Sequence, residues 1–149
     1  MTAIKYIHIL LAITALGANI TYGAWMMRAK QQPEHMGFTL RGVKFIDDFI
    51  ANPCYVFLPL TGITLMWRQG YTFSNAHWAG AALILWVLLS MVAIGVYSPT
   101  LRGQIRVLES EGVDSLMFKR METRARIVGP LLGVIALAIV YLMVAKPSL

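Results

Sequence analysis

Two histidines stand in long apolar segments, where an imidazole could bind a metal. His8 lies inside the apolar run of residues 6–27, and His77 opens the run of residues 77–97. Neutral imidazole is a common metal ligand, and two imidazoles from separate helices can occupy both axial positions of a haem iron. The two histidines therefore predict a haem site between two helices, with His8 and His77 as its metal ligands.

Small side chains accompany both histidines. At about 100° per residue, one helix face of the first run carries His8, Ala12, Ala15 and Asn19. Gly80 and Ala81 follow His77 within about one turn. These small residues would leave room for the macrocycle. Asn19 must find its hydrogen-bond partner on another helix or on a ligand, because lipid offers none. The opposite face, with Ile9, Ile13 and Ile20, is expected to contact lipid.

Other uses of these residues remain open. His8 can hydrogen-bond between helices without a ligand, and His77 can lie at the membrane interface beside Trp78. A methionine cluster near a predicted membrane boundary is suited to copper(I) or to helix-end packing, and comprises Met26, Met27 and Met36 with His35. The HEXXH motif, the phosphate-binding glycine loop, the nucleophile elbow and the CXXC pair are absent, so whether the chain is an enzyme stays open.

The composition indicates an integral membrane protein. Of the 149 residues, 58% are hydrophobic and 13% are charged, which is too apolar for a soluble globule. Four segments reach the length of a membrane helix, at about residues 4–27, 49–67, 77–97 and 127–145. We predict an all-α fold, in which residues 1–149 form one domain with a four-transmembrane-helix bundle. The first segment resembles a signal peptide at its start, but its apolar character continues to Met27 and favours a permanent span.

The basic residues predict the orientation. Of 13 Lys and Arg residues, 10 lie in the connections at residues 28–48 and 98–126. The positive-inside rule therefore places both connections in the cytoplasm and both termini outside. These positions explain the net charge of +6 without a nucleic-acid partner. Amphipathic helical pieces are expected around Leu101 to Leu108, and again from Ser115 into the fourth span.

Several residues predict local features of the spans. Pro59 should bend the second span, and Asn52 before Pro53 is expected to cap its helix. The preceding Asp47 and Asp48 should form a solvated helix end. In the fourth span, a stripe of small residues suits close helix packing within the bundle or in a homodimer, and consists of Gly129, Gly133, Ala136 and Val140.

Three apolar segments carry a family resemblance: LLAITALGANITYGAW after His8, PLTGITLMWRQGY in the second span, and HWAGAALILWVLL in the third. Over nearly the whole chain the sequence resembles a bacterial family of predicted four-helix membrane proteins, domain of unknown function 2269. That family is distantly similar to CopD-type copper-resistance proteins and to HemJ-type protoporphyrinogen oxidases, in which transmembrane histidines and b-type haem recur. The resemblance implies a haem ligand at His8 only. A matching intramembrane lysine is missing, so the HemJ activity is not implied.

The leading hypothesis is a membrane protein that binds b-type haem and takes part in electron transfer, with quinone as a candidate partner. The alternative is a cofactor-free accessory or assembly subunit, which would pack against a larger membrane complex. Copper handling is a third hypothesis. Under each hypothesis, membrane lipids are expected to surround the helices, and the protein could be a monomer or a homodimer.

Overall fold

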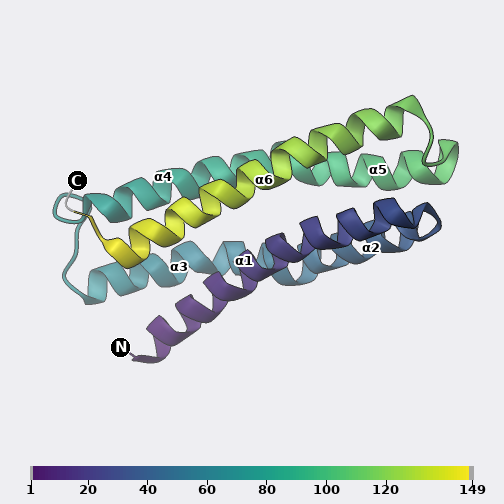
Figure 1. The fold of residues 1–149 in the computed structure, drawn as a ribbon. Helices are drawn as coiled ribbons and strands as arrows, with labels where there is room; N and C mark the ends of the chain where they lie inside the picture. Colours follow the sequence, from purple (N-terminus) through teal and green to yellow (C-terminus); the bar gives the residue numbers. More distant parts are fainter. Residues whose placement is uncertain (1, 148–149) are drawn as a thin grey trace.

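The computed structural model describes residues 2–147, which form an all-α bundle without strands. The first long helix is α1 (Thr2–Gln31). The second begins with a short 3-10 turn, η1 (Pro33–His35), and continues through α2 (Met36–Ile46), the π-helical turn η2 (Asp47–Ala51) and α3 (Asn52–Arg68). The third comprises α4 (His77–Val92), the π-helical turn η3 (Ala93–Tyr97) and α5 (Ser98–Glu111), and the fourth is α6 (Leu116–Ala145). Figure 1 shows the four long helices side by side.

All four long helices are apolar enough to cross a membrane, as predicted. Two of them are much longer than a membrane requires, since the second has 36 residues and the third has 35. At 1.5 Å per residue each is over about 50 Å long, whereas the hydrocarbon core is about 30 Å thick. The predicted spans at residues 49–67 and 77–97 are therefore only the parts of these continuous helices that lie nearest the loop between α3 and α4. The long connections are themselves mainly helical.

The bundle is closed at one end and divided into pairs at the other. At the end formed by α2 and α5, these two helices pack on each other and also contact α1 and α6, respectively. The main hydrophobic core lies here, around Leu40, Val43, Leu101 and Phe118. Toward the other end α1 packs on α3 and α4 packs on α6 (Figure 1). Residues near the start of α1 and those near the start of α4 consequently belong to different helix pairs.

The predicted faces of α1 are largely confirmed. Ile9, Ile13 and Ile20 are exposed, whereas Ala15 and Tyr22 are buried. The cause is that only small or polar side chains fit where α1 meets its neighbours, while the aliphatic side chains are left for lipid.

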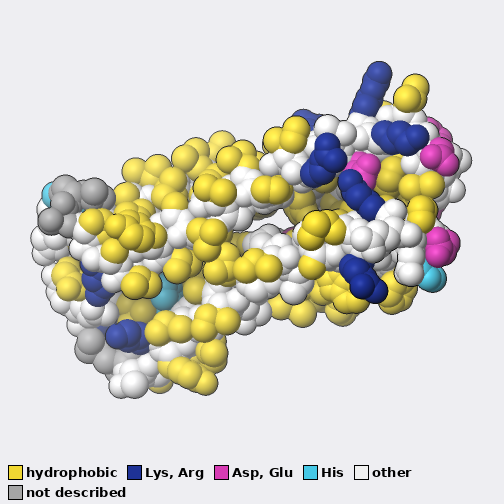
Figure 2. Space-filling view, viewed as in Figure 1, with side chains coloured by type: hydrophobic (Ala, Val, Ile, Leu, Met, Phe, Trp, Pro, Cys, Tyr) yellow, Lys and Arg dark blue, Asp and Glu magenta, His cyan; other side chains and the backbone are white. Residues whose placement is uncertain are grey.

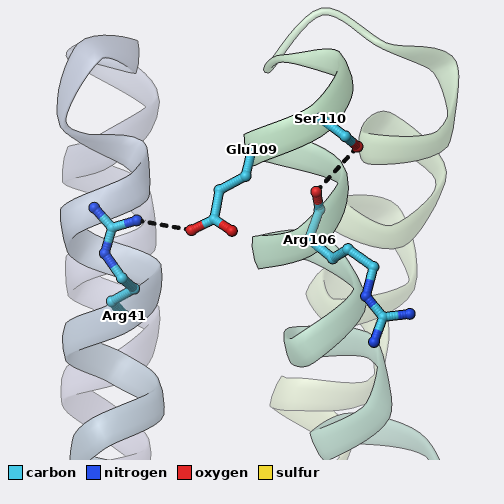
Figure 3. Close-up of polar contacts among 4 residues, drawn as sticks. All are labelled: Arg41, Arg106, Glu109 and Ser110. Atoms are coloured by element: carbon cyan, nitrogen blue, oxygen red, sulfur yellow. Dashed lines mark hydrogen bonds and ion pairs between the residues drawn. The ribbon is translucent and has the colours of Figure 1, made fainter.

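The closed end also carries most of the charge. In the view of Figure 2, Lys and Arg side chains gather with the Asp and Glu side chains at this end. Arg41 on α2 donates to Glu109 on α5 over 3.1 Å (Figure 3), and Lys30 on α1 lies 2.8 Å from Glu122 on α6. Both chain termini lie at the opposite end (Figure 1). These contacts tie the helices together where they extend beyond the membrane.

Which end faces the cytoplasm is a prediction that labelling can test. In a Cys54→Ala background, a cysteine at Gln69 should react with an impermeant thiol reagent added outside the cell, and one at Glu111 should stay unlabelled. The background change removes the only cysteine, which is buried. Labelling at Glu111 but not at Gln69 would show that the orientation in the membrane is the opposite of the predicted one.

Two helix starts were predicted from capping residues, at Ser115 and at Asn52, and only the first is found. The Ser115 hydroxyl accepts from the Phe118 N–H at 3.0 Å, and Gly112 ends α5 with a φ of 86°, so the predicted start of the last helical piece is confirmed. The predicted cap at Asn52 is wrong. The helix continues through that residue from the preceding π-helical turn, so Asn52 has no free helix start to cap.

The two glycines of the α6 stripe have different surroundings. A Cβ at Gly129 would lie 3.8 Å from the Tyr97 ring, whereas a Cβ at Gly133 would have nothing within 4 Å. We therefore expect Gly129→Leu to lower the melting temperature, because the added side chain must displace Tyr97. Gly133→Leu should leave the monomer's melting temperature unchanged. If Gly133→Leu also abolishes crosslinking between copies of the protein, the stripe is a dimer contact at Gly133.

Candidate functional site

His8 is held against α3. Its Nδ1 lies 2.7 Å from Oγ1 of Thr61, and the Thr61 hydroxyl donates to the Phe57 carbonyl at 2.8 Å. In the tautomer with its proton on Nδ1, the ring donates to Oγ1 and Nε2 keeps its lone pair, whereas in the other tautomer Nδ1 accepts from the Thr61 hydroxyl. Gly62 makes the approach possible, since a Cβ there would lie 3.2 Å from Cε1 of His8. The ring is therefore oriented by α3, and one of its two tautomers can bind a metal through Nε2.

The other residues of α1 that were predicted to line the site, Ala12, Ala15 and Asn19, have different surroundings. Ala15 is buried, and its carbonyl accepts from Nδ2 of Asn19 at 3.1 Å. Asn19 also donates to the Tyr55 hydroxyl, so it has found the partner on another helix that the sequence required. Ala12 is half-buried. Asn19 therefore joins α1 to α3, and Ala12, one turn after His8, keeps part of its surface exposed.

His77 lies in the other helix pair. It is the first residue of α4, and Gly80 and Ala81 follow it, both half-buried. Thr61 stands 7 residues before the end of α3 at Arg68, so His8 lies about 10 Å inside that end of the bundle. His77 thus lies nearer the end of the bundle than His8 does. The two histidines share one end of the bundle but come from pairs α1–α3 and α4–α6.

The methionine cluster is used mainly for packing. Met36 is 2% exposed, and both Met36 and Met26 belong to the main hydrophobic core. Among residues 2–147, no three His, Cys, Asp or Glu side chains come together as a metal-binding group. Met36 and Met26 thus have apolar neighbours, whereas Met27 is 66% exposed.

A second polar group lies beside the π-helical turns, and sequence reasoning missed it. Asp47 is 8% exposed, and the turn η2 that carries it packs against α1, α2 and α3. The prediction that Asp47 is a solvated helix end is therefore wrong, and of the two aspartates Asp48 is the more exposed. The cause is that the helix begins at Pro33, which places Asp47 well inside it, in the turn that packs against α1.

Backbone irregularity accompanies this group in both long helices. The Asn52 N–H donates to the Asp47 carbonyl, and the Ser98 N–H donates to the Ala93 carbonyl, so both bonds span five residues. A proline follows each donor and has no N–H, so a carbonyl at each junction lacks its helical donor. The Asn-Pro and Ser-Pro dipeptides were the available sequence signal. Single π-helical turns inside α-helices frequently mark functional sites.

Four apolar helices that enclose buried polar side chains define a multi-pass integral membrane protein. The sequence comparison agrees with this class. Residues 2–147 match the model of a family described as predicted integral membrane proteins, domain of unknown function 2269, and the chain belongs to that family. No curated protein and no solved structure matches the chain.

Proposed function

We propose that the protein binds a b-type haem through His8 and His77 and takes part in electron transfer in the bacterial inner membrane. The observation that supports this most is the hydrogen bond between Nδ1 of His8 and Thr61. Histidines that bind metals usually have the other ring nitrogen held by a hydrogen bond, which fixes the tautomer and the ring orientation. Thr61 plays that part for His8.

The surroundings are compatible with a macrocycle between the two helix pairs. His8 and His77 start from different pairs, so a flat group between α1 and α4 would not have to separate two packed helices. Ala12, Gly80 and Ala81 are small and half-buried, and they would leave space for that group. When bound, haem supplies one-electron redox chemistry, and the chain supplies the ligands and an apolar site. Quinone is the proposed partner, as an electron carrier that dissolves in the bilayer.

A difference spectrum tests this proposal. The protein is produced in a bacterium with haem precursor supplied, purified in mild detergent, and measured in its reduced and oxidised forms. We expect b-type haem bands with about one haem per chain. A folded protein that stays colourless after haem supplementation would contradict the proposal.

A cofactor-free accessory subunit is the second candidate, and the outer surface of the helices favours it. Gly17 and Gly23 on α1 and Gly133 on α6 have nothing within 4 Å of the position of a Cβ. Such open small residues let another helix approach closely. If this candidate is correct, the colourless protein should co-purify with a membrane complex, and cysteines at Gly17 or Gly133 should crosslink to its subunits.

A further inference from the structure

Most arginines at the charged end have no acidic partner within the described residues 2–147. All the lysines in the connections at residues 28–48 and 98–126 are paired with acidic side chains, namely Lys30, Lys44 and Lys119. Of the arginines there, only Arg41 is paired, with Glu109. The others are all exposed, and they are Arg28, Arg102, Arg106, Arg120, Arg124 and Arg126. Their positive charges are available to a partner outside the chain.

Four of these arginines lie at one level on two packed helices. We call them the arginine face: Arg102 and Arg106 on α5, and Arg120 and Arg124 on α6. The two helices meet at Gly103, where a Cβ would lie 2.9 Å from both Sδ and Cε of Met121. Gly103 follows Arg102 and Met121 follows Arg120, so a rise of 1.5 Å per residue places all four arginines within about 9 Å along the helix axes. The arginine face is therefore one compact region of positive charge.

The arginine face points away from the core and keeps its hydrogen-bond donors. Gln104 of α5 is 0% exposed and Phe118 of α6 is 1% exposed, and a residue two positions from either lies on nearly the opposite side of its helix. The guanidinium of Arg106 points away from Glu109 (Figure 3). Arg102 donates to the Ser98 hydroxyl at 3.1 Å, which occupies one of its five N–H groups. Free guanidinium groups bind phosphate with two parallel hydrogen bonds.

One side of α6 changes from arginine to aliphatic side chains. Ile127, Leu131 and Val134 follow Arg120 by 7, 11 and 14 residues, a spacing that keeps them on the same helix face. They are 65%, 48% and 63% exposed, and Ile127 begins the predicted fourth span. A molecule that lies along this side meets positive charge first and an apolar surface next. This order fits a phospholipid with an anionic headgroup, and it does not fit free phosphate or a nucleic acid.

We propose that the arginine face is a binding site for an anionic phospholipid. The headgroup phosphate accepts hydrogen bonds from guanidinium groups of both helices, and the acyl chains lie against Ile127, Leu131 and Val134 of α6. The lipid would thereby bridge α5 and α6 where they leave the membrane. This site lies at the end of the bundle opposite to His8 and His77, and it needs no haem.

A lipid titration of the full-length protein tests the proposal. The purified protein in a neutral detergent is titrated with short-chain phosphatidylglycerol, or with phosphatidylcholine of the same acyl length, and native mass spectrometry counts the lipids bound per chain. We expect phosphatidylglycerol to bind more tightly. The double variant Arg102→Gln/Arg120→Gln should lower its affinity about 25-fold, because each basic residue near an anionic lipid surface contributes about a fivefold factor.

Arg28→Gln/Arg126→Gln is the matched control, since it removes the same charge at the same end of the bundle. Arg28 lies on α1, and Arg126 follows Arg124 by two residues and so points to nearly the opposite side of α6. The control should keep the affinity of the unmodified protein. Equal losses in the two double variants, or equal binding of the two lipids, would overturn the proposal. Equal occupancy by inorganic phosphate at the same concentration would also overturn it, because the site would then bind free phosphate.

Melting followed by circular dichroism checks that the variants fold. The replaced arginines are all exposed, so the melting temperature in detergent without added lipid should be unchanged. If the double variant unfolds, the single variants Arg102→Gln and Arg120→Gln give the same test, with an expected loss of affinity of about fivefold each.

Discussion

Replacing His8 with Ala should remove the low-spin haem spectrum of the purified protein completely. The imidazole is the proposed ligand that α3 orients, and α1 contains no other histidine. His77→Ala should likewise abolish the spectrum or convert it to that of a single-ligand haem. Absorption and electron paramagnetic resonance spectra of each variant, normalised to protein, measure the effect. Both variants should still insert into the membrane, because neither helix depends on one imidazole for its apolar length.

Two further variants separate ligation from general damage. His35→Ala should leave the spectrum unchanged, because His35 ends the short turn before α2, at the other end of the bundle. Thr61→Val should keep the haem but broaden or shift its spectrum, since it removes the hydrogen bond that orients the His8 ring. If His8→Ala retains a normal spectrum, His8 is not a ligand and serves only to join α1 to α3.

Phe118→Ala should destabilise the protein by about 3–5 kcal/mol, the usual cost of removing a buried aromatic ring. Phe118 is 1% exposed and lies in the core formed where α1, α2, α5 and α6 meet. This core is at the charged end of the bundle, where we expect burial from water to contribute to its stability. Thermal unfolding in detergent, followed by circular dichroism, measures the loss.

Phe38→Ala is the matched control for that experiment. Phe38 lies on α2 at the same end of the molecule but is 75% exposed, so its removal leaves no cavity. We expect a change within about 0.5 kcal/mol. Equal effects of the two substitutions would mean that the core at this end is not packed as described, or that Phe38 contacts lipid or a partner whose loss costs as much.

Local sequence determined the elements and their faces. The periodicity of α1 predicted that Ile13 is exposed and Ala15 is buried, because each residue advances by a fixed angle around the helix axis. The start of α6 was equally predictable, since the Ser115 hydroxyl satisfies a backbone N–H within its own turn. The family resemblance is confirmed as well, over residues 2–147. These features depend on residues that are neighbours in the chain.

The tertiary structure decided which residues meet. Thr61 lies 53 residues after His8, and Tyr55 lies 36 residues after Asn19. Helical periodicity gives the direction of a side chain about its own axis, but neither the neighbouring helix nor the axial register. The burial of Asp47 was missed for the same reason. A carboxyl group before an apolar span looks like a solvated helix end, until its turn is found packed against α1, α2 and α3.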